Sequence, residues 1–143
     1  MSTPNPGPSR PRTRRSTIAA RADVTAAGAD ALAVLAFVLV GRRSHEEGSV
    51  VLGTLTTAWP FLAGADLGWL ALLGVRSSGR DWSAISLPAG ATVLGGTVVG
   101  GMLLRRLSGT GGTPVSFVVV ATSFLSLTLL GWRVVARLRG RRG

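Results

Sequence analysis

The sequence predicts an all-α integral membrane protein with four transmembrane helices, and three observations support this fold class. Four apolar segments are separated by short turns, charged residues are 15% of the 143 residues and nearly absent from those segments, and arginine is concentrated in the turns. The segments lack the alternating polar positions of half-buried soluble elements. A chain of this length allows one domain. The apolar segments cover residues 22–40, 50–74, 84–104 and 115–132.

Each apolar segment is about as long as a helix must be to cross a hydrocarbon core of roughly 30 Å. Residues 1–21, before the first segment, are rich in Pro, Ser, Thr and Arg. They offer little apolar surface to bury, so we expect a disordered basic cytoplasmic tail. A signal peptide would combine a short basic start with a shorter apolar core. A transit peptide, suggested by the Arg and Ser content, is the less favoured alternative. We expect the transmembrane domain to cover residues 22–139 and a basic C-terminal tail to cover residues 140–143.

The distribution of arginine predicts the orientation of the protein. With four spans, both chain ends and the middle turn share one side of the membrane. Twelve arginines lie on that side and four on the opposite side. Since positive charge favours the cytoplasm, we expect both termini to be cytoplasmic, in the plasma membrane. The twelve are Arg10, Arg12, Arg14, Arg15, Arg21, Arg76, Arg80, Arg133, Arg137, Arg139, Arg141 and Arg142; the four are Arg42, Arg43, Arg105 and Arg106.

Charge and composition also limit the partners and the chemistry. A net charge of +10 usually raises nucleic acid as a partner. Here the arginines lie at the edges of apolar segments, so we expect the lipid bilayer and its anionic headgroups as partners and no nucleic acid. The chain has no cysteine, no lysine and one histidine. We therefore expect no metal and no cofactor. Because the sequence offers no nucleophile–base pair, we also expect no enzymatic activity.

The two halves of the chain resemble a tandem repeat of a helical hairpin. Because two spans restore the same orientation, the halves would be related by an axis normal to the membrane. Chance matching between apolar segments is the alternative explanation. A shift of 63 residues without a gap matches Arg42-Arg43 with Arg105-Arg106, Phe61-Leu62 with Phe124-Leu125, and Leu67-Gly68-Trp69 with Leu130-Gly131-Trp132.

The first half carries the candidate polar membrane site, formed by Asp30, Asp66 and His45, none of which is matched in the second half. Both aspartates lie eight residues from the expected cytoplasmic ends of their spans, which places them roughly 12 Å deep. Adjacent antiparallel helices would bring the two carboxylates to one level. Repulsion and the apolar surroundings would keep at least one of them protonated. This is the chemistry of a proton or cation site.

A structural interpretation of the same residues competes with this one, and of the two it is favoured. Each carboxylate could hydrogen-bond to a neighbouring Thr, Ser or Trp, or pair with Arg21 or Arg76. A charge inside a bilayer needs such a partner or a cavity. His45 could titrate near physiological pH, or could be a polar turn residue at the level of the lipid headgroups.

Proline and glycine predict how the spans bend and pack. Pro60 predicts a kink, because it removes one backbone donor and frees the carbonyl of Thr56. The kink could open a cavity or only adjust packing. Two small-xxx-small pairs predict close approach of helix backbones. We expect the glycine-rich third span to be the most enclosed helix or a dimer seam. The two pairs are Gly64 with Gly68 and Gly96 with Gly100.

Two segments, together with Asp30 and Phe37, are similar to a bacterial and archaeal family of small multi-pass membrane proteins, named domain of unknown function 3054. The resemblance covers roughly residues 22–138. It implies an integral membrane protein with four helices and no assigned activity. The segments are Gly41-Arg42-Arg43-Ser44-His45 and Thr57-Ala58-Trp59-Pro60-Phe61-Leu62-Ala63-Gly64.

Two functions follow as expectations. The leading one is a small, dimeric, proton- or ion-linked transporter- or channel-like protein that uses Asp30, Asp66 and His45. The alternative is a non-catalytic membrane scaffold or accessory subunit that binds another membrane protein. The alternative is supported by the lack of a recognisable catalytic set and by the glycine-rich third span.

Overall fold

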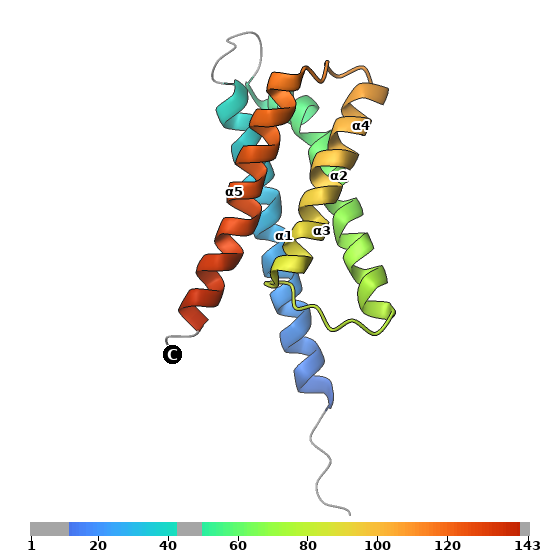
Figure 1. Ribbon diagram of the computed structural model, residues 1–143, viewed down its shortest axis with the longest axis vertical. Helices are drawn as coiled ribbons and strands as arrows, with labels where there is room; N and C mark the ends of the chain where they lie inside the picture. Colours follow the sequence, from blue (N-terminus) through green and yellow to red (C-terminus); the bar gives the residue numbers. More distant parts are fainter. Residues whose placement is uncertain (1–11, 43–49, 141–143) are drawn as a thin grey trace, which may run out of the picture.

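The computed structural model describes the backbone of residues 12–42 and 50–140, and all of its regular structure there is helical (Figure 1). Four stretches are long and apolar enough to cross a membrane: Thr17–Gly41, Val51–Ser77, Leu87–Leu107 and Val115–Gly140. The predicted all-α fold with four transmembrane helices is therefore confirmed. The elements are α1 (Arg12–Arg42), α2 (Val50–Ser77), α3 (Leu87–Gly95), η1 (Gly96–Gly100), α4 (Gly101–Leu107) and α5 (Val115–Gly140).

The third span is one continuous rod made of α3, a single π-helical turn η1, and α4. The glycines at both junctions keep right-handed helical backbone angles. The rod starts at a defined cap, where the Ser86 hydroxyl accepts a hydrogen bond of 3.2 Å from the Ala89 amide. A π-turn inserts one extra residue into a helix. Here it lies within the glycine-rich stretch of the span.

Helix α1 begins earlier than expected. We expected residues 1–21 to form a disordered tail, but the helix starts at Arg12. The physical reason lies in the sequence after Pro11, which has no further proline and no glycine before Gly28. Arg and Ala, both strong helix formers, recur in this stretch. Residues 1–11, 43–49 and 141–143 lie outside the described residues.

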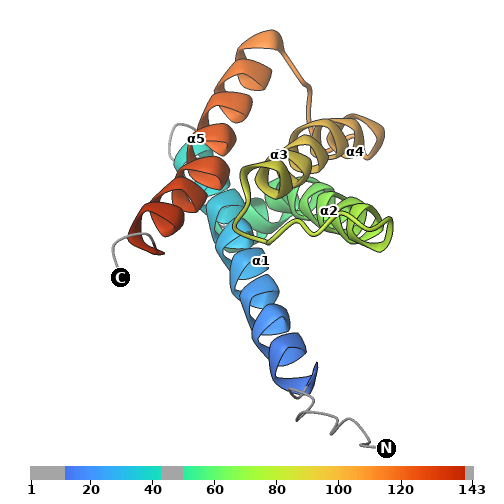
Figure 2. The ribbon, with the colours of Figure 1, turned by 60° about the horizontal axis from the view of Figure 1, so that its bottom comes forward.

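The four spans form a closed ring. Helix α1 packs against α2 and α5, and α3 packs against the same two helices. The start of α1, the α2–α3 connection and the end of α5 lie at one end of the bundle (Figures 1 and 2). Two hairpins related by an axis along the bundle would give this order of contacts.

One seam of the ring is made by direct backbone contact between α2 and the third span. A Cβ added to Gly64 would lie 2.6 Å from the amide nitrogen of Gly101 and 2.7 Å from the carbonyl oxygen of Gly96. A Cβ on Gly96 would lie 2.5 Å from the Cα of Gly68. Gly100 is also in this seam, where its added Cβ would lie 3.3 Å from the Cα of Gly64. Helix α2 is the most enclosed span, whereas we expected the third span to be either the most enclosed helix or a dimer seam.

The opposite seam, between α1 and α5, is filled by aromatic rings. Under the 63-residue shift, Phe37 of α1 stands where the third span has Gly100. Phe37 contacts Phe61 of α2 and Phe124 of α5, with ring centroids 5.6 and 5.7 Å apart. Phe61 and Phe124 are themselves matched by the shift. Because α1 has a large side chain at this position, its backbone cannot approach α5 as α2 approaches the third span.

Pro60 lies inside α2, and the helix continues on both sides of it. The proline ring is buried. The hydroxyls of Thr56 and Thr57 do not turn toward the carbonyl that the proline frees, because both donate to the carbonyl of Gly53. Thr56 also donates to the carbonyl of Leu52. Side-chain hydroxyls therefore add hydrogen bonds in the turn before the proline.

Candidate functional site

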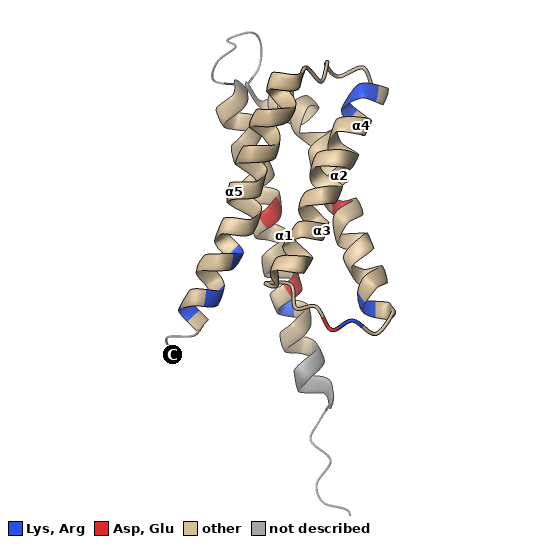
Figure 3. Cartoon of the chain, viewed as in Figure 1, with Lys and Arg blue, Asp and Glu red and all other residues tan. Residues whose placement is uncertain are grey.

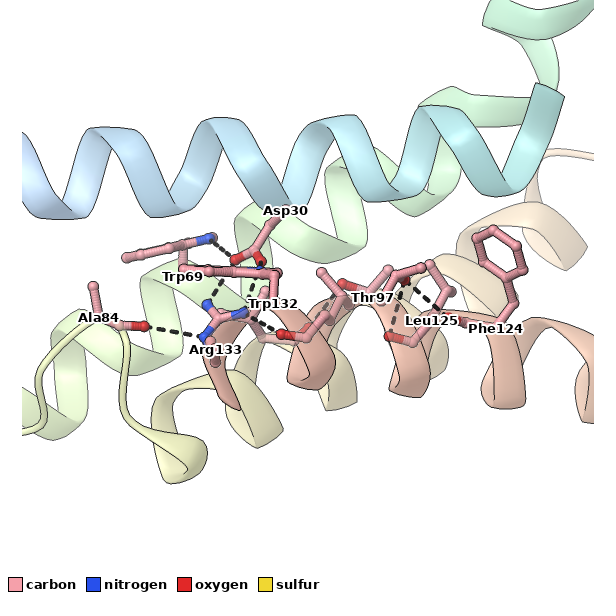
Figure 4. A network of polar contacts seen from close by, with 11 residues as sticks. Asp30, Trp69, Ala84, Thr97, Phe124, Leu125, Trp132 and Arg133 are labelled. Carbon is pink, nitrogen blue, oxygen red and sulfur yellow. Dashed lines mark hydrogen bonds and ion pairs between the residues drawn. The ribbon is translucent and has the colours of Figure 1, made fainter. Parts of the chain in front are cut away.

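Asp30 of α1 forms a buried ion pair with Arg133 of α5, although the two residues are far apart in the sequence. The Asp30 Oδ1 atom lies 2.7 Å from Nη1 of Arg133, and Oδ2 lies 2.8 Å from Nη2. This is the two-pronged geometry in which a guanidinium matches a carboxylate. Both residues are 0% exposed. The pair therefore joins the first and last helices from inside the bundle (Figure 4).

Two indole rings complete the coordination of the same carboxylate. Trp132 of α5 donates its Nε1–H to Oδ1 at 3.0 Å, and Trp69 of α2 donates its Nε1–H to Oδ2 at 3.2 Å. Each oxygen of Asp30 thus accepts two hydrogen bonds, which matches the number of its lone pairs. We call Asp30, Trp69, Trp132 and Arg133 the Asp30 cluster (Figure 4).

The guanidinium of Arg133 is held by the backbone as well as by Asp30. Its Nε donates to the carbonyl of Ala84 at 3.0 Å, and its Nη1 donates to the carbonyl of Leu129 at 2.8 Å. The guanidinium carbon lies 4.5 Å from the centre of the Trp132 ring. Gly90 makes room for the side chain, because a Cβ there would lie 2.6 Å from Cδ of Arg133. The arginine therefore ties α5 to the turn before α3.

Helical periodicity explains why Arg133 points inward. The buried residues of α5 are spaced four apart and form one stripe, so the arginine continues an otherwise apolar row. From the sequence, Arg133 was counted only among the arginines that indicate topology, and its role as the partner of Asp30 was missed. The stripe was the signal that could have identified it, because an arginine at the next inward position requires a buried anion. The stripe consists of Ala121, Leu125, Leu129 and Arg133.

The structure does not bring Asp30 and Asp66 together. Asp30 is enclosed by the cluster, whereas Asp66 is exposed on the outer side of α2. The inward face of α2 passes through Ala65, Gly68 and Leu72. Successive residues of a helix are rotated by about 100°, so Asp66 lies on the side of α2 that faces away from the bundle. Equal depth was a sound expectation for helices of this length, but it does not determine which face a residue occupies.

A second ion pair lies nearer the end of the bundle that holds the helix α1 start. Asp23 of α1 accepts a hydrogen bond of 2.8 Å from Nη1 of Arg76 of α2. The Nε of the same arginine donates to the carbonyl of Trp82 at 2.7 Å. Both charged side chains are partly exposed. From the sequence, Arg76 was a candidate partner for Asp30 or Asp66, but it pairs with Asp23.

His45, the third member of the predicted polar site, lies outside the described residues, as do Glu46 and Glu47. Within residues 12–42 and 50–140, no group of three or more His, Cys, Asp or Glu side chains could hold a metal ion. Most basic residues of this region lie toward the ends of the helices, and acidic residues also occur within the bundle (Figure 3).

These features define a small multi-pass α-helical membrane protein whose first and last spans are joined by a buried charge pair. The chain belongs to the family described as protein of unknown function DUF3054, whose family model matches residues 27–136. The matched range contains the whole Asp30 cluster. No curated protein and no solved structure matches the chain.

Proposed function

We propose that the protein is a non-catalytic membrane scaffold or accessory subunit that binds another membrane protein. The observation that supports this proposal is the saturation of Asp30. Its two oxygens accept four hydrogen bonds, at 2.7 to 3.2 Å, from three residues of the chain itself. A carboxylate with every lone pair in use has no acceptor to offer to an ion or a proton. The Asp30 cluster therefore acts as a structural link between helices.

Charge balance supports the same function. Asp30 and Arg133 neutralise each other, and both are removed from solvent. Separating them would leave two uncompensated charges in an apolar interior, which is strongly unfavourable. Asp66, the other carboxylate at membrane depth, lies outside the bundle. Transport that uses both aspartates would require them to face a common pathway, and they face different surroundings.

A proton- or ion-linked transporter is the second candidate. The observation in its favour is the position of the Asp30–Arg133 pair, since ionisable residues inside transmembrane helices commonly belong to ion pathways. In such a protein, protonation of Asp30 would release Arg133 and let α5 move away from α1. In this mechanism the hydrogen bonds of the Asp30 cluster break during transport, whereas in the scaffold they persist.

Proton flux into vesicles distinguishes these two functions. Purified protein would be reconstituted into liposomes that contain a pH-sensitive dye, and an imposed proton gradient and a potassium diffusion potential would drive flux. The scaffold predicts the same flux as in vesicles without protein. Flux that depends on the protein, and is lost in Asp30→Asn but kept in the matched control Asp23→Asn, would overturn the scaffold proposal.

Partner binding supplies the positive test of the scaffold. Crosslinking in native membranes, followed by quantitative mass spectrometry, should recover another membrane protein in an amount comparable to the chain. The same partner should be recovered after detergent extraction without crosslinker. Recovery of the chain alone, or only as a multimer of itself, would contradict an accessory role.

The orientation proposed for this function has both termini in the cytoplasm of the plasma membrane, with arginines in contact with anionic lipid headgroups. The arginine distribution supports it: with the buried Arg133 set aside, eleven of the twelve arginines remain on the side of the chain ends, against four on the other. This excess still favours that side as the cytoplasmic one.

Cysteine labelling tests the orientation without interference, because the chain has no cysteine of its own. Ser78→Cys lies in the α2–α3 connection, and Ser108→Cys lies in the α4–α5 connection at the other end of the bundle. A membrane-impermeant reagent added to intact cells should label Ser108→Cys and leave Ser78→Cys unlabelled. Labelling of Ser78→Cys from outside would reverse the topology.

A further inference from the structure

We propose that a second copy of this chain docks on the outer face of α2, with the two Asp66 carboxyl groups hydrogen-bonded to each other across a two-fold axis. The dimer goes beyond the scaffold function, which concerns a different membrane protein as partner. Three observations support the dimer: the position of Asp66, the spacing of the residues around it, and the hydrogen bonds that a carboxyl group can form.

Asp66 lies at membrane depth on the outer face of the bundle. It is eleven residues from the end of the span Val51–Ser77 at Ser77, or roughly 16 Å along a helix. The side chain is exposed, and none of the described residues forms a hydrogen bond or ion pair with it. An unpaired charge facing hydrocarbon costs several kcal/mol. The carboxyl group therefore needs a partner from another molecule.

The surroundings of Asp66 have the pattern of a helix-pairing seam. Residues on this face of α2 recur at alternating intervals of four and three, which is the heptad spacing of paired helices. All of those with a described side chain are exposed except Ala63, which is half-buried. This α2 seam consists of Leu52, Thr56, Trp59, Ala63, Asp66, Leu70, Leu73 and Ser77.

The seam also permits close approach at the level of the carboxyl group. Ala63 is one turn before Asp66 in the seam, and a small residue there lets two helix backbones come near each other. Leu70 and Leu73 follow Asp66 on the other side and supply apolar contact. Asp66 therefore has a small neighbour in the seam on one side, which lets a second helix come near the carboxyl group.

A second copy is the complementary partner because a carboxyl group in its protonated form carries one O–H donor and one carbonyl acceptor, so two such groups satisfy each other with two hydrogen bonds. A two-fold axis places a residue against its own counterpart. Among the described residues, Arg76 is already paired with Asp23 and Arg133 with Asp30. Two copies inserted in the same orientation would make α2 pair in parallel.

Disulfide crosslinking tests the seam directly, since the native chain has no cysteine. Single variants Ala63→Cys, Leu70→Cys and Leu73→Cys would be reconstituted in liposomes at a high lipid-to-protein ratio and oxidised. We expect a covalent dimer from all three, because paired seam positions bring Cβ atoms within disulfide reach. Ala71→Cys is the matched control: it is exposed and adjacent to Leu70, but points away from the seam. Leu127→Cys is an exposed control on α5.

The role of the carboxyl group is tested in the Leu70→Cys background. Asp66→Leu removes the hydrogen bonds and should reduce crosslinking roughly fivefold or more, the factor expected for an interhelical polar contact of ordinary strength in a membrane. Asp66→Asn should preserve crosslinking, because an amide also matches itself. Since Asp66 faces outward, both variants should keep the helical content of the parent.

Two results would overturn the dimer. One is crosslinking of Ala71→Cys and Leu127→Cys as efficient as that of Leu70→Cys, which indicates random collision. The other is absence of crosslinking at all three seam positions, which assigns the α2 seam to lipid or to a different protein. Neither result bears on the scaffold, which is tested by proton flux and by recovery of a different membrane protein. Conversely, protein-dependent flux that is lost in Asp30→Asn and kept in Asp23→Asn would overturn the scaffold and leave the dimer intact.

Discussion

Trp69 and Trp132 donate their indole N–H groups to opposite oxygens of the single carboxylate of Asp30. The 63-residue shift matches these two tryptophans, and it also matches Phe61 with Phe124, which both contact Phe37. Matched residues of the two halves therefore converge twice on α1. Asp30 itself has Val93 as its counterpart. The two tryptophans occupy matching positions in the two halves, but Asp30, to which both donate, has no matching aspartate in the second half.

The first prediction concerns the buried charge pair. Arg133→Gln should destabilise the bundle by about 3–5 kcal/mol, because it leaves Asp30 buried without its counter-charge. The measurement is unfolding of the purified protein in mixed micelles with increasing SDS. Arg139→Gln, which changes an exposed arginine of the same helix, should alter stability by less than about 0.5 kcal/mol. Equal effects of the two substitutions would show that the pair contributes nothing specific.

A second prediction separates loss of one charge from loss of both. Asp30→Leu combined with Arg133→Met should be more stable than either single variant, since it leaves no uncompensated charge. The same SDS titration measures it. Additive losses in the double variant would indicate that the two residues act independently, against the geometry of the pair.

Third, the two indoles should contribute similarly. Trp69→Phe and Trp132→Phe each remove one hydrogen bond to the ionised Asp30, at a cost of about 1.5–3 kcal/mol. Trp82→Phe is the control, because only the backbone carbonyl of Trp82 is used by Arg76. Unfolding midpoints of the three variants provide the comparison. A loss confined to the control would contradict the role of the indole N–H groups.

The fourth prediction concerns the glycine seam. Gly96→Ala should destabilise the protein by about 1–3 kcal/mol or more, because the new methyl group would meet the backbone of α2. Gly95→Ala, one residue earlier, adds a methyl group where nothing lies within 4 Å. It should be neutral or slightly stabilising, because alanine is the better helix former. Thermal unfolding followed by circular dichroism tests the contrast.

A fifth prediction contrasts the outer ion pair with the buried one. Asp23→Asn should cost about 1 kcal/mol or less, because the Asp23–Arg76 pair is partly exposed. Its contribution should also fall as salt is added, since exposed charges are screened. The Asp30–Arg133 pair should be much less sensitive to salt. Unfolding at low and high ionic strength measures both effects, and equal salt dependence would contradict the difference in burial.

The fold was predictable because length and hydropathy alone define a membrane span. The four apolar segments became the four spans, and the glycine pairs of α2 and the third span lie in their shared seam. The limits of the helices were less accurate. Arginine and alanine are strong helix formers. Helices α1 and α5 therefore extend beyond their apolar parts.

The candidate site was predicted only in part, because the depth of a residue in the membrane does not determine the direction in which its side chain points. The positions of Asp30 and Asp66 gave similar depths, yet one side chain points inward and the other outward. Arg133, the charged partner of Asp30, was missed because the arginines that follow the last apolar segment were assigned to the membrane interface. Arg133 lies one turn after Leu129 on the buried face of α5, and that periodicity was the information needed.

The Asp30–Arg133 pair also sets an order of events during synthesis. Asp30 enters the membrane with the first span, whereas Arg133 is the last buried residue of the fourth. Because chains are made from the N-terminus, the carboxylate must spend the insertion of three spans without its counter-charge. A chain interrupted before α5 would expose an unmatched acid inside the membrane. The fourth span therefore supplies the counter-charge that the first span requires.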